Sequence, residues 1–303
     1  MTRSVHYTAF GDPSTLKIGE VDPLPMGPDC VEIAVAGAGI NPVDWKIMRG
    51  YLTGAFEHHL PIVPAWDVAG EVTAVGPSVT EVAPGDRVYA YARLDVIGHG
   101  TAAEVVRLPI RVLAKAPESI DLVTAAAVPL AGLTAFQLVG RTGISAGQTV
   151  LVHNASGGVG QFAVQIARAR GARVIGTASA ANHEHLRELG VEPVSYGEGL
   201  AEAVAELAPD GVDVALDLIG GGALEQVRAG NYGSITDAQG VQALGGEYVF
   251  VRPSSADLQE LASMIDAGEI VVDLAGTYPF SEAAKAYELL ENGHVRGKIV
   301  LVP

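Results

Sequence analysis

A glycine-rich turn at residues 155–160 carries the clearest chemical signal in this chain of 303 residues. Ala155, Gly157 and Gly160 occupy the three positions of a G-x-G-x-x-G pattern, with alanine in place of the first glycine. In such a turn the backbone N–H groups and the positive end of the following helix converge on one point, which suits a pyrophosphate. The residues predicted to bind a dinucleotide there are Ala155, Ser156, Gly157, Gly158, Val159 and Gly160.

Two elements must position this turn. Residues 149–152 are β-branched or apolar and predict a buried strand, whereas residues 161–168 have helical periodicity. A strand before the turn and a helix after it form the context that the pattern requires. The alternative interpretation is a purely structural strand–helix turn.

Strands and helices alternate around this unit, which predicts a doubly wound parallel sheet. The predicted strands cover residues 150–153, 173–177, 193–195, 212–216 and 247–251. The predicted helices cover residues 120–138, 161–170, 181–189 and 199–207. Residues 223–230 lead directly into residues 231–237, so we expect either a shortened helix after Gly222 or an omitted stretch.

The regions before and after this alternating segment have a different sequence pattern. Residues 1–115 hold short β-like runs separated by Gly and Pro, which predicts a compact antiparallel β domain. Its predicted strands cover residues 31–36, 67–75, 86–92 and 103–106. After Pro253 we expect helices at 256–267 and 281–291 and a closing strand at 298–302.

Composition excludes several classes of function. The net charge is −16 and no basic cluster is present, which argues against nucleic-acid binding. The single cysteine excludes a disulfide framework and a cysteine-based zinc site. No apolar run reaches the roughly 18 residues of a membrane span, and the N-terminus lacks an apolar signal core. We therefore expect a cytoplasmic protein with no membrane partner.

Six stretches together resemble the zinc-free medium-chain dehydrogenase/reductases, especially the quinone and enone oxidoreductases related to zeta-crystallin. They run in family order and are AGINPVDWKIMRG (38–50), residues 64–90, AAAVPLAGLTAF (125–136), residues 155–179, DVALDLIGG (213–221) and HVRGKIVLVP (294–303). The resemblance implies an α/β fold with a GroES-like β domain at 1–119 and 253–303. It also implies a Rossmann dinucleotide-binding domain at 120–252, with a parallel sheet.

The resemblance also bears on metal and reaction class. Asp44 and Trp66 stand where zinc-dependent members place ligands, and Ala65-Trp66-Asp67 replaces their G-H-E, so we expect no metal. Oxidation of an unactivated alcohol is difficult without a Lewis acid. Hydride transfer to a quinone or an α,β-unsaturated carbonyl needs only hydrogen-bond donors at the oxygen. The alternatives are a non-catalytic cofactor-binding protein and, less favoured, an alcohol dehydrogenase.

In the N-P-V-D-W-K stretch the resemblance implies substrate-orienting roles for Asn41 and Asp44. Lys46 is the candidate to stabilise an enolate or to donate a proton, with water as the other proton source. Tyr51 is expected to line the substrate site. The structural alternatives are a turn-capping carboxylate for Asp44 and a solvated surface lysine for Lys46.

We expect NADPH as the cofactor. No acid follows the second strand of the predicted sheet until Glu184, and Ser179 leaves room for a 2′-phosphate. The family often has a lysine shortly afterwards, where this chain has Asn182 and His183. The other residues that the resemblance assigns to the cofactor are Thr134, Tyr196, Ser234, Phe250, Val251, Arg252 and Lys298.

The resemblance implies two further features. Relatives commonly form homodimers by pairing the late Rossmann strand, here residues 247–251. Substrate walls come from variable loops, here residues 51–60 and 91–100.

Overall fold

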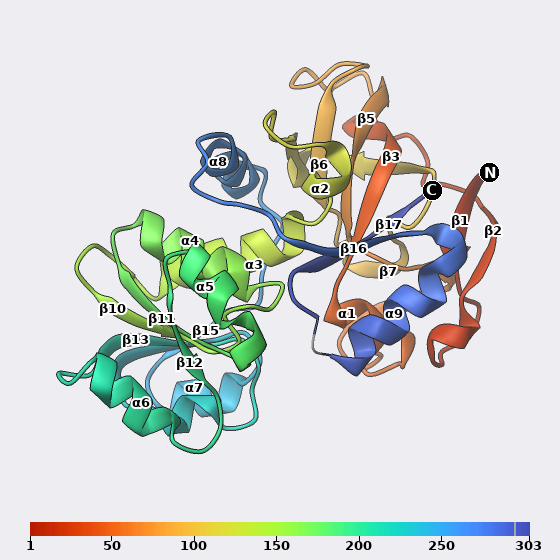
Figure 1. The fold of residues 1–303 in the computed structure, drawn as a ribbon. Coiled ribbons are helices and arrows are strands. Elements are labelled where there is room, and N and C mark those ends of the chain that lie inside the picture. The colour runs from red at the N-terminus through yellow and green to blue at the C-terminus, as the bar shows by residue number, and fades with distance from the viewer. Residues whose placement is uncertain (294) are drawn as a thin grey trace. The chain divides into compact units, whose positions relative to one another are not determined.

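The computed structural model describes residues 1–293 and 295–303. His294, which begins the last of the six resembling stretches, lies outside the described residues. The chain forms two compact units, and Figure 1 shows the elements of both. Unit 1 comprises Met1–Leu130, Pro253–Ala267 and Val272–Pro303, and unit 2 comprises Ala131–Arg252 and Gly268–Val271.

Unit 2 is built on a six-stranded sheet whose strands all run parallel, in the order β12-β11-β10-β13-β14-β15. The strands are β10 (Thr149–Val152), β11 (Arg173–Ala178), β12 (Glu192–Ser195), β13 (Val212–Asp217), β14 (Ala229–Ser234) and β15 (Glu247–Tyr248). Counted along the chain, this is the 3-2-1-4-5-6 order of dinucleotide-binding sheets. The prediction of a doubly wound Rossmann domain is confirmed.

Helices cover both faces of this sheet, and Figure 1 shows α4 and α6 on opposite sides of it. The helices are α3 (Pro129–Arg141), α4 (Gly160–Ala169), α5 (His183–Glu188), α6 (Leu200–Leu207) and α7 (Ala238–Ala243), with 3-10 turns η3 (Ala180–Asn182) and η4 (Ala223–Gln226). One buried cluster joins β10, β11 and β13 to α6 through residues such as Leu151, Ile175 and Leu200. The strands that precede the predicted nucleotide-binding turns therefore pack against a buried core.

Unit 1 is mainly β. Its seven-stranded sheet has the order β16-β17-β3-β5-β6-β9, with β8 also paired to β3. These strands are β3 (Cys30–Ile40), β5 (Asp67–Val75), β6 (Arg87–Tyr91), β8 (Val105–Pro109), β9 (Leu113–Lys115), β16 (Leu274–Pro279) and β17 (Lys298–Val302). The C-terminal strand β17 pairs antiparallel with β3, as Figure 1 shows where the blue strand meets the orange one. The expected return of the C-terminus to the β domain is thus observed.

Shorter elements complete unit 1. Two small sheets pair β1 (Thr2–His6) with β2 (Lys17–Val21) and β4 (Glu57–Val63) with β7 (Val96–His99). The helices are α1 (Pro42–Met48), α2 (Leu122–Ala125), α8 (Ser255–Asp266) and α9 (Ala283–Asn292), with 3-10 turns η1 (Pro13–Thr15), η2 (Ile110–Val112) and η5 (Phe280–Glu282). Among the described residues, no helix is long and apolar enough to cross a membrane.

Two local predictions are corrected, and one expectation concerns the residues after Gly222. The predicted helix 120–138 is two helices, because Pro129 cannot continue a helix through its missing N–H and restricts the residue before it. The predicted strand 247–251 is only Glu247–Tyr248, although the Val249 N–H still donates to Ser234 at 2.9 Å. After Gly222 the chain forms only the 3-10 turn η4, and β14 begins shortly after it.

Candidate functional site

The glycine-rich turn of unit 2 follows β10 through Asn154, whose φ of 58° lies in the left-handed region. A Cβ atom on Gly157 would lie 2.7 Å from Asn154 Nδ2. A Cβ on Gly160 would lie 2.2 Å from the Asn154 carbonyl oxygen. Backbone atoms leave no room for a side chain at Gly160, whereas at Gly157 the Asn154 amide would have to move, so Gly160 is the position at which the tight turn into α4 requires glycine.

Ala155, the departure from the glycine pattern, is explained by its neighbour on β11. Its side chain is fully buried, and its Cβ lies 2.7 Å from the point that a Cβ on Gly176 would occupy. The missing side chain of Gly176 therefore makes the space that the Ala155 methyl group fills. The first position of the glycine pattern is therefore alanine in this chain, and the glycine that gives it room is Gly176 in β11.

Three backbone N–H groups at the start of α4, those of Gly158, Val159 and Gly160, have no protein acceptor within the described residues. Such groups and the helix dipole favour an anion at a helix N-terminus. Together with the two glycines of the turn, they fit the pyrophosphate of a dinucleotide. Dinucleotide binding is the function that the sequence of this turn predicts.

Polar side chains gather where β11 ends. Asn182 Nδ2 donates to Ser156 Oγ at 3.2 Å and lies 3.4 Å from Ser179 Oγ, so it links the turn to the end of the strand. His183 follows directly as the first residue of α5, and its ring Nε2 lies 3.4 Å from a backbone oxygen of β11. Tyr196, predicted in the same pocket, follows β12 and is 59% exposed.

Ser234 lies in a buried network around Asp217 at the ends of β13 and β14. Its hydroxyl donates to Asp217 Oδ2 at 2.7 Å, and Thr236 Oγ1 donates to the same atom at 2.7 Å. The backbone N–H groups of Ile219 and Gly220 donate to Asp217 Oδ1. Burial alone raises the pKa of Asp217, but these four hydrogen bonds outweigh it and hold the pKa below its usual value. Ser234 thus holds the loop that follows β13.

Gln137 fixes the segment after β15. Its side chain accepts from the Arg252 N–H at 3.1 Å and donates to the Arg252 carbonyl oxygen at 3.0 Å. Next to Arg252, Val251 is buried and Phe250 is 51% exposed. Thr134, the other predicted cofactor residue of this unit, is buried on α3.

Unit 1 brings three of the predicted residues together in a buried polar cluster, consisting of Asn41, Asp44, Asp67 and Lys298. Asn41 follows β3 and caps α1, and its N–H donates to Asp44 Oδ2 at 2.7 Å. Its Nδ2 donates to Asp67 Oδ2 at 2.8 Å, and its Oδ1 accepts from Lys298 Nζ. Asp67 also accepts the Leu130 N–H at 2.8 Å and lies 3.7 Å from Lys298 Nζ. Lys298 is 4% exposed, so it is not a surface lysine.

The cluster holds two carboxyl groups and one ammonium group away from water. Burial raises the pKa of Asp44 to about 8, with Asp67 adding to the rise and the Asn41 N–H and Lys298 opposing it. Burial also raises the pKa of Asp67 to about 6, against the opposing charge of Lys298 and the hydrogen bond from Asn41. Burial lowers the pKa of Lys298 despite both carboxylates. At neutral pH the cluster therefore consists of protonated Asp44, ionised Asp67 and Lys298.

Two tyrosines border this cluster. Tyr7 and Tyr287 are fully buried, and their hydroxyl oxygens have no hydrogen-bond partner among the described residues. Burial raises the pKa of both phenols, and the nearby Asp44 raises it further. Both phenols therefore keep their protons at neutral pH.

Lys46 and Tyr51 have a different environment from Asn41 and Asp44, although all four were predicted as catalytic. Lys46 is exposed on α1, and its Nζ lies 5.7 Å from the centroid of the Trp45 ring. Tyr51 is 70% exposed and packs edge-on against Trp45 at 6.2 Å between ring centroids. These side chains face solvent and are accessible to a small molecule.

Ala65 and Trp66 occupy the positions at which zinc-dependent relatives have G-H. Ala65 has a φ of 68°, a conformation that favours glycine, and Trp66 is buried against Tyr91. Within residues 1–293 and 295–303, no group of three or more His, Cys, Asp or Glu side chains is placed to hold a metal ion.

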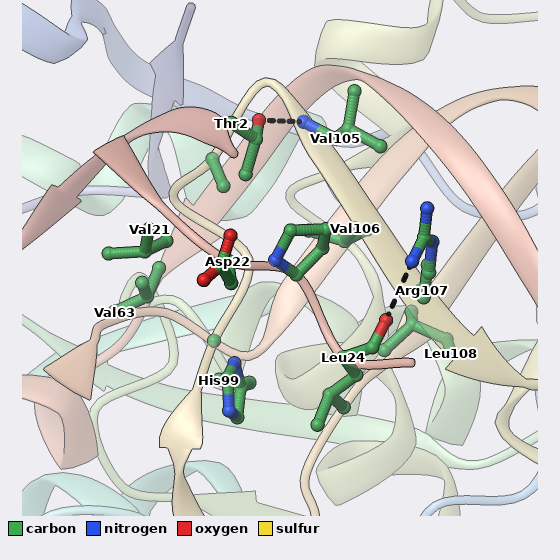
Figure 2. A pocket seen from close by; sticks show the side chains of 13 residues that line it. Thr2, Val21, Asp22, Leu24, Val63, His99, Val105, Val106, Arg107 and Leu108 are labelled. Atoms are coloured by element: carbon green, nitrogen blue, oxygen red, sulfur yellow. Dashed lines mark hydrogen bonds between the residues drawn. The ribbon is translucent and has the colours of Figure 1, made fainter. Parts of the chain in front are cut away.

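Figure 2 shows a small pocket of unit 1 that lies outside the buried cluster. Its volume is about 20 Å³, room for about one water molecule. Two of its polar side chains are paired, since Thr2 Oγ1 accepts the Val105 N–H at 3.1 Å and Arg107 donates to the Leu24 carbonyl at 3.0 Å. This pocket is too small for an organic substrate.

A second pocket, of about 390 Å³, is lined by residues of the two loops predicted as substrate walls. His59 comes from the first loop and Leu94, Val96 and His99 from the second, with Leu24 completing the apolar lining. Burial and the neighbouring His59 lower the pKa of His99. The pocket has the size of a small-molecule site.

The sequence did not single out Asp67, Gln137 or Asn182 as site residues. Asp67 and Asn41 are 26 positions apart, and Gln137 and Arg252 are 115 positions apart, so no local spacing relates them. The sequence did hold a signal that could have identified Asn182 as a cofactor residue. It stands shortly after the second Rossmann strand, where the family often has lysine.

Two family models match the chain. "Alcohol dehydrogenase GroES-like domain" matches residues 27–118, and "Zinc-binding dehydrogenase" matches residues 189–301. The first match falls within unit 1, and the second covers part of each unit.

Known proteins resemble the chain over nearly its full length. An NADPH-dependent alkenal/one oxidoreductase, chloroplastic, from Arabidopsis thaliana is 36% identical over 310 residues, covering 98% of this chain and 78% of the relative. The structure of the quinone oxidoreductase from Coxiella burnetii has a TM-score of 0.88 at 28% identity and covers 100% of this chain and 99% of that one. An NAD-dependent alcohol dehydrogenase has a TM-score of 0.89 at 28% identity, with 99% of each chain covered.

Proposed function

The chain belongs to the medium-chain dehydrogenase/reductase superfamily of NAD(P)-binding oxidoreductases, and from that premise we propose that it is an NADPH-dependent reductase of quinones or α,β-unsaturated carbonyls. The observation that carries the proposal is the turn before α4, in which Gly160 has no room for a side chain and three N–H groups are unpaired among the described residues. The end of β11 supports NADPH over NADH, because it carries Ser179 and Asn182 and no carboxylate for a 2′-hydroxyl.

In the proposed reaction, bound NADPH supplies the hydride. This chain contributes the N–H groups of residues 158–160, which hold the pyrophosphate, and the polar group at the end of β11, which holds the adenosine ribose. An acceptor carbon that takes a hydride transfers negative charge to the conjugated oxygen, which needs a hydrogen-bond donor. Lys46 is exposed and offers an ammonium group for that oxygen, and the proton comes either from Lys46 or from water.

Protonated Asp44 and the other members of the buried cluster hold α1, the helix that carries Lys46, in place. Asn41 begins this helix and Asp44 lies in its first turn, so both act on Lys46 through the backbone. We therefore assign Asn41 and Asp44 to positioning Lys46, and the direct contact with substrate to Lys46 and Tyr51.

The test is NADPH oxidation by the purified protein with a panel of quinones, alkenals and enones. Loss of the NADPH absorbance band with at least one acceptor is expected. Lys46→Ala should lower kcat by about 100-fold, the scale of a lost general acid or donor. Lys17→Ala, which removes another exposed lysine of unit 1, is the matched control and should leave kcat unchanged.

Three outcomes would redirect the proposal. Cofactor binding without oxidation by any acceptor would favour the non-catalytic alternative. Oxidation of simple alcohols with NAD⁺ would favour the activity named for the structural relative. Full turnover by Lys46→Ala would remove the lysine from the mechanism and leave water as the proton source.

We also propose that two copies pair through β15 to extend the six-stranded sheet. β15 is the last strand of that sheet and has a neighbour, β14, on one side only. An unpaired strand edge is a template for a second strand. Phe250, immediately after it, is 51% exposed and would be covered by such pairing.

A further inference from the structure

Asp67 contacts the first turns of two helices, one with each oxygen of its carboxylate. Its Oδ2 accepts from Asn41 Nδ2 at 2.8 Å, and Asn41 caps α1, the helix that carries Lys46. Its Oδ1 accepts the Leu130 N–H at 2.8 Å, and Leu130 is the second residue of α3. A single side chain thus holds the start of the lysine-bearing helix and the start of α3, which continues into unit 2.

The start of α3 has no capping side chain of its own. Pro129 is its first residue and lacks an N–H, so the Leu130 N–H is the first donor of the helix. Donors in the first turn of a helix have no acceptor within that helix. Val128, directly before the helix, has an apolar side chain. Asp67, 63 positions away, therefore supplies the oxygen that a local Ser, Thr, Asp or Asn ordinarily provides, and its negative charge suits a helix N-terminus.

The surroundings of Asp67 make room for this contact. Thr101 Oγ1 donates to the Asp67 backbone oxygen at 2.8 Å and fixes the strand there. Gly39 lies beside it on β3, where a Cβ would be 3.0 Å from the Asp67 Cβ and 2.3 Å from the Ala126 carbonyl oxygen. Because position 39 is glycine, the segment that leads into α3 can lie close to Asp67.

The contacts of Lys298 distinguish this role from charge balance. Its Nζ lies 3.7 Å from Asp67 Oδ2, beyond hydrogen-bond distance. The ammonium group donates instead to the Ile40 carbonyl oxygen at 3.0 Å and to Asn41 Oδ1. Asp67 is therefore a counter-charge for the lysine and a hydrogen-bond acceptor for the two helices, and variants can separate these two roles.

We propose that Asp67 is a positioning residue for the nicotinamide half of NADPH and acts through the first turn of α3. This inference rests on the proposed function, because it concerns the same cofactor. In that function the turn before α4 holds the pyrophosphate and the end of β11 holds the adenosine ribose. Thr134, which lies on α3 and which the resemblance also assigns to the cofactor, is left for the nicotinamide half. Loss of the acceptor at Asp67 loosens the start of α3 and weakens binding of that half alone.

The test compares two double variants that both remove the buried charges. Asp67→Asn/Lys298→Met retains an amide oxygen for the Leu130 N–H, whereas Asp67→Leu/Lys298→Met has nearly the same shape and no acceptor. Calorimetry measures the affinity for NADPH and for 2′-phospho-ADP-ribose, which lacks only the nicotinamide. We expect Asp67→Leu/Lys298→Met to bind NADPH about tenfold more weakly than its partner variant, the effect of one lost helix cap. The two variants should bind 2′-phospho-ADP-ribose equally.

A local cap should reverse the loss. Val128→Thr keeps the branched shape of the side chain and places a hydroxyl at the position from which threonine caps a helix. Added to Asp67→Leu/Lys298→Met, it should recover roughly threefold in NADPH affinity. Val139→Thr in the same background is the matched control, because Val139 is equally buried but lies inside α3, and it should recover nothing.

Hydrogen exchange in the unaltered protein decides the matter if Asp67→Leu/Lys298→Met does not fold. NADPH should slow exchange of the Leu130 N–H about tenfold more than 2′-phospho-ADP-ribose does, because only NADPH occupies the nicotinamide half.

The possible results are distinct. Equal affinities of the two double variants for NADPH, equal losses for both nucleotides, or equal slowing of the Leu130 N–H by both would overturn this inference and leave the cofactor site standing. Absence of binding of either nucleotide to the unaltered protein would overturn the proposed function as well.

Discussion

At the scale of single residues, the two buried aspartates have opposite requirements. Asp67 is the ionised partner of Lys298 and accepts hydrogen bonds from Asn41 and Leu130. Asp44 has its pKa raised to about 8, chiefly by burial, and is protonated at neutral pH. An uncharged side chain of the same shape should therefore replace Asp44 and fail to replace Asp67.

We predict that Asp44→Asn keeps stability within about 1 kcal/mol of the unaltered protein near neutral pH, since its amide oxygen can still accept the Asn41 N–H. Asp67→Asn should cost roughly 3 kcal/mol, because it leaves Lys298 buried without a counter-charge. Urea unfolding followed by circular dichroism measures both. Equal losses in the two variants would contradict the assigned protonation states.

The same carboxyl group predicts a pH dependence with a definite sign. Asp44 binds its proton more tightly when folded, so its contribution to stability is complete below the unfolded pKa and is lost as the pH rises toward about 8. The difference in unfolding free energy between the unaltered protein and Asp44→Asn should therefore shrink from about pH 5 to about pH 8. The difference cancels groups such as Asp217, whose lowered pKa acts in the opposite direction. A growing difference would show that Asp44 is ionised in the folded protein.

At the scale of elements, the local sequence pattern predicts the bounds of those strands that are determined by their own residues. The strands Asp67–Val75 and Lys298–Val302 have the bounds predicted from alternation and turn signals. β14 was not predicted, because Ala229–Ser234 contains two glycines and an asparagine and gains its strand conformation from β13 and β15. Element boundaries that depend on a neighbouring strand cannot be obtained from local sequence.

The pairing of Ala155 with Gly176 links the turn to β11 and gives a reciprocal prediction. Gly176→Ala should destabilise unit 2 by about 1–3 kcal/mol and weaken nucleotide binding, because its methyl group would meet Ala155 and Val191 within 2.8 Å. Ala155→Gly in the same molecule should recover part of both losses by removing one of the two contacts. A double-mutant cycle with urea unfolding and nucleotide titration measures the coupling, and strict additivity would contradict this packing.

At the scale of the whole molecule, the resemblance predicted the two-part architecture, whereas the residue contacts inside unit 1 required the structure. Lys298 and Asn41 are 257 positions apart in the chain and still make a hydrogen bond. The sequence identified both residues by motif and could not show that they meet each other and Asp67. Sequence patterns describe neighbours along the chain, and this cluster is assembled from the start of α1, from β5 and from β17.

The proposed dimer provides a prediction at this scale. Phe250→Lys should convert the protein to a monomer, because two like charges would approach each other where the β15 edges of two copies meet. Leu244→Lys, at another exposed apolar position of unit 2, is the control and should leave the assembly unchanged. Light scattering coupled to gel filtration gives the mass, and an unaltered protein that is already monomeric would remove the proposal.

The pairing of β17 with β3 determines an order of events during biosynthesis. A ribosome makes Asp44 and Asp67 long before it makes Lys298, the counter-charge for Asp67. Until then the sheet of unit 1 lacks its β16–β17 edge, and its two acidic groups have no cation to accompany them into the interior. Unit 2, whose strands all lie between residues 149 and 248, has all its strands available before that point. The nucleotide-binding unit thus has all its strands before β16 and β17 of unit 1 are made.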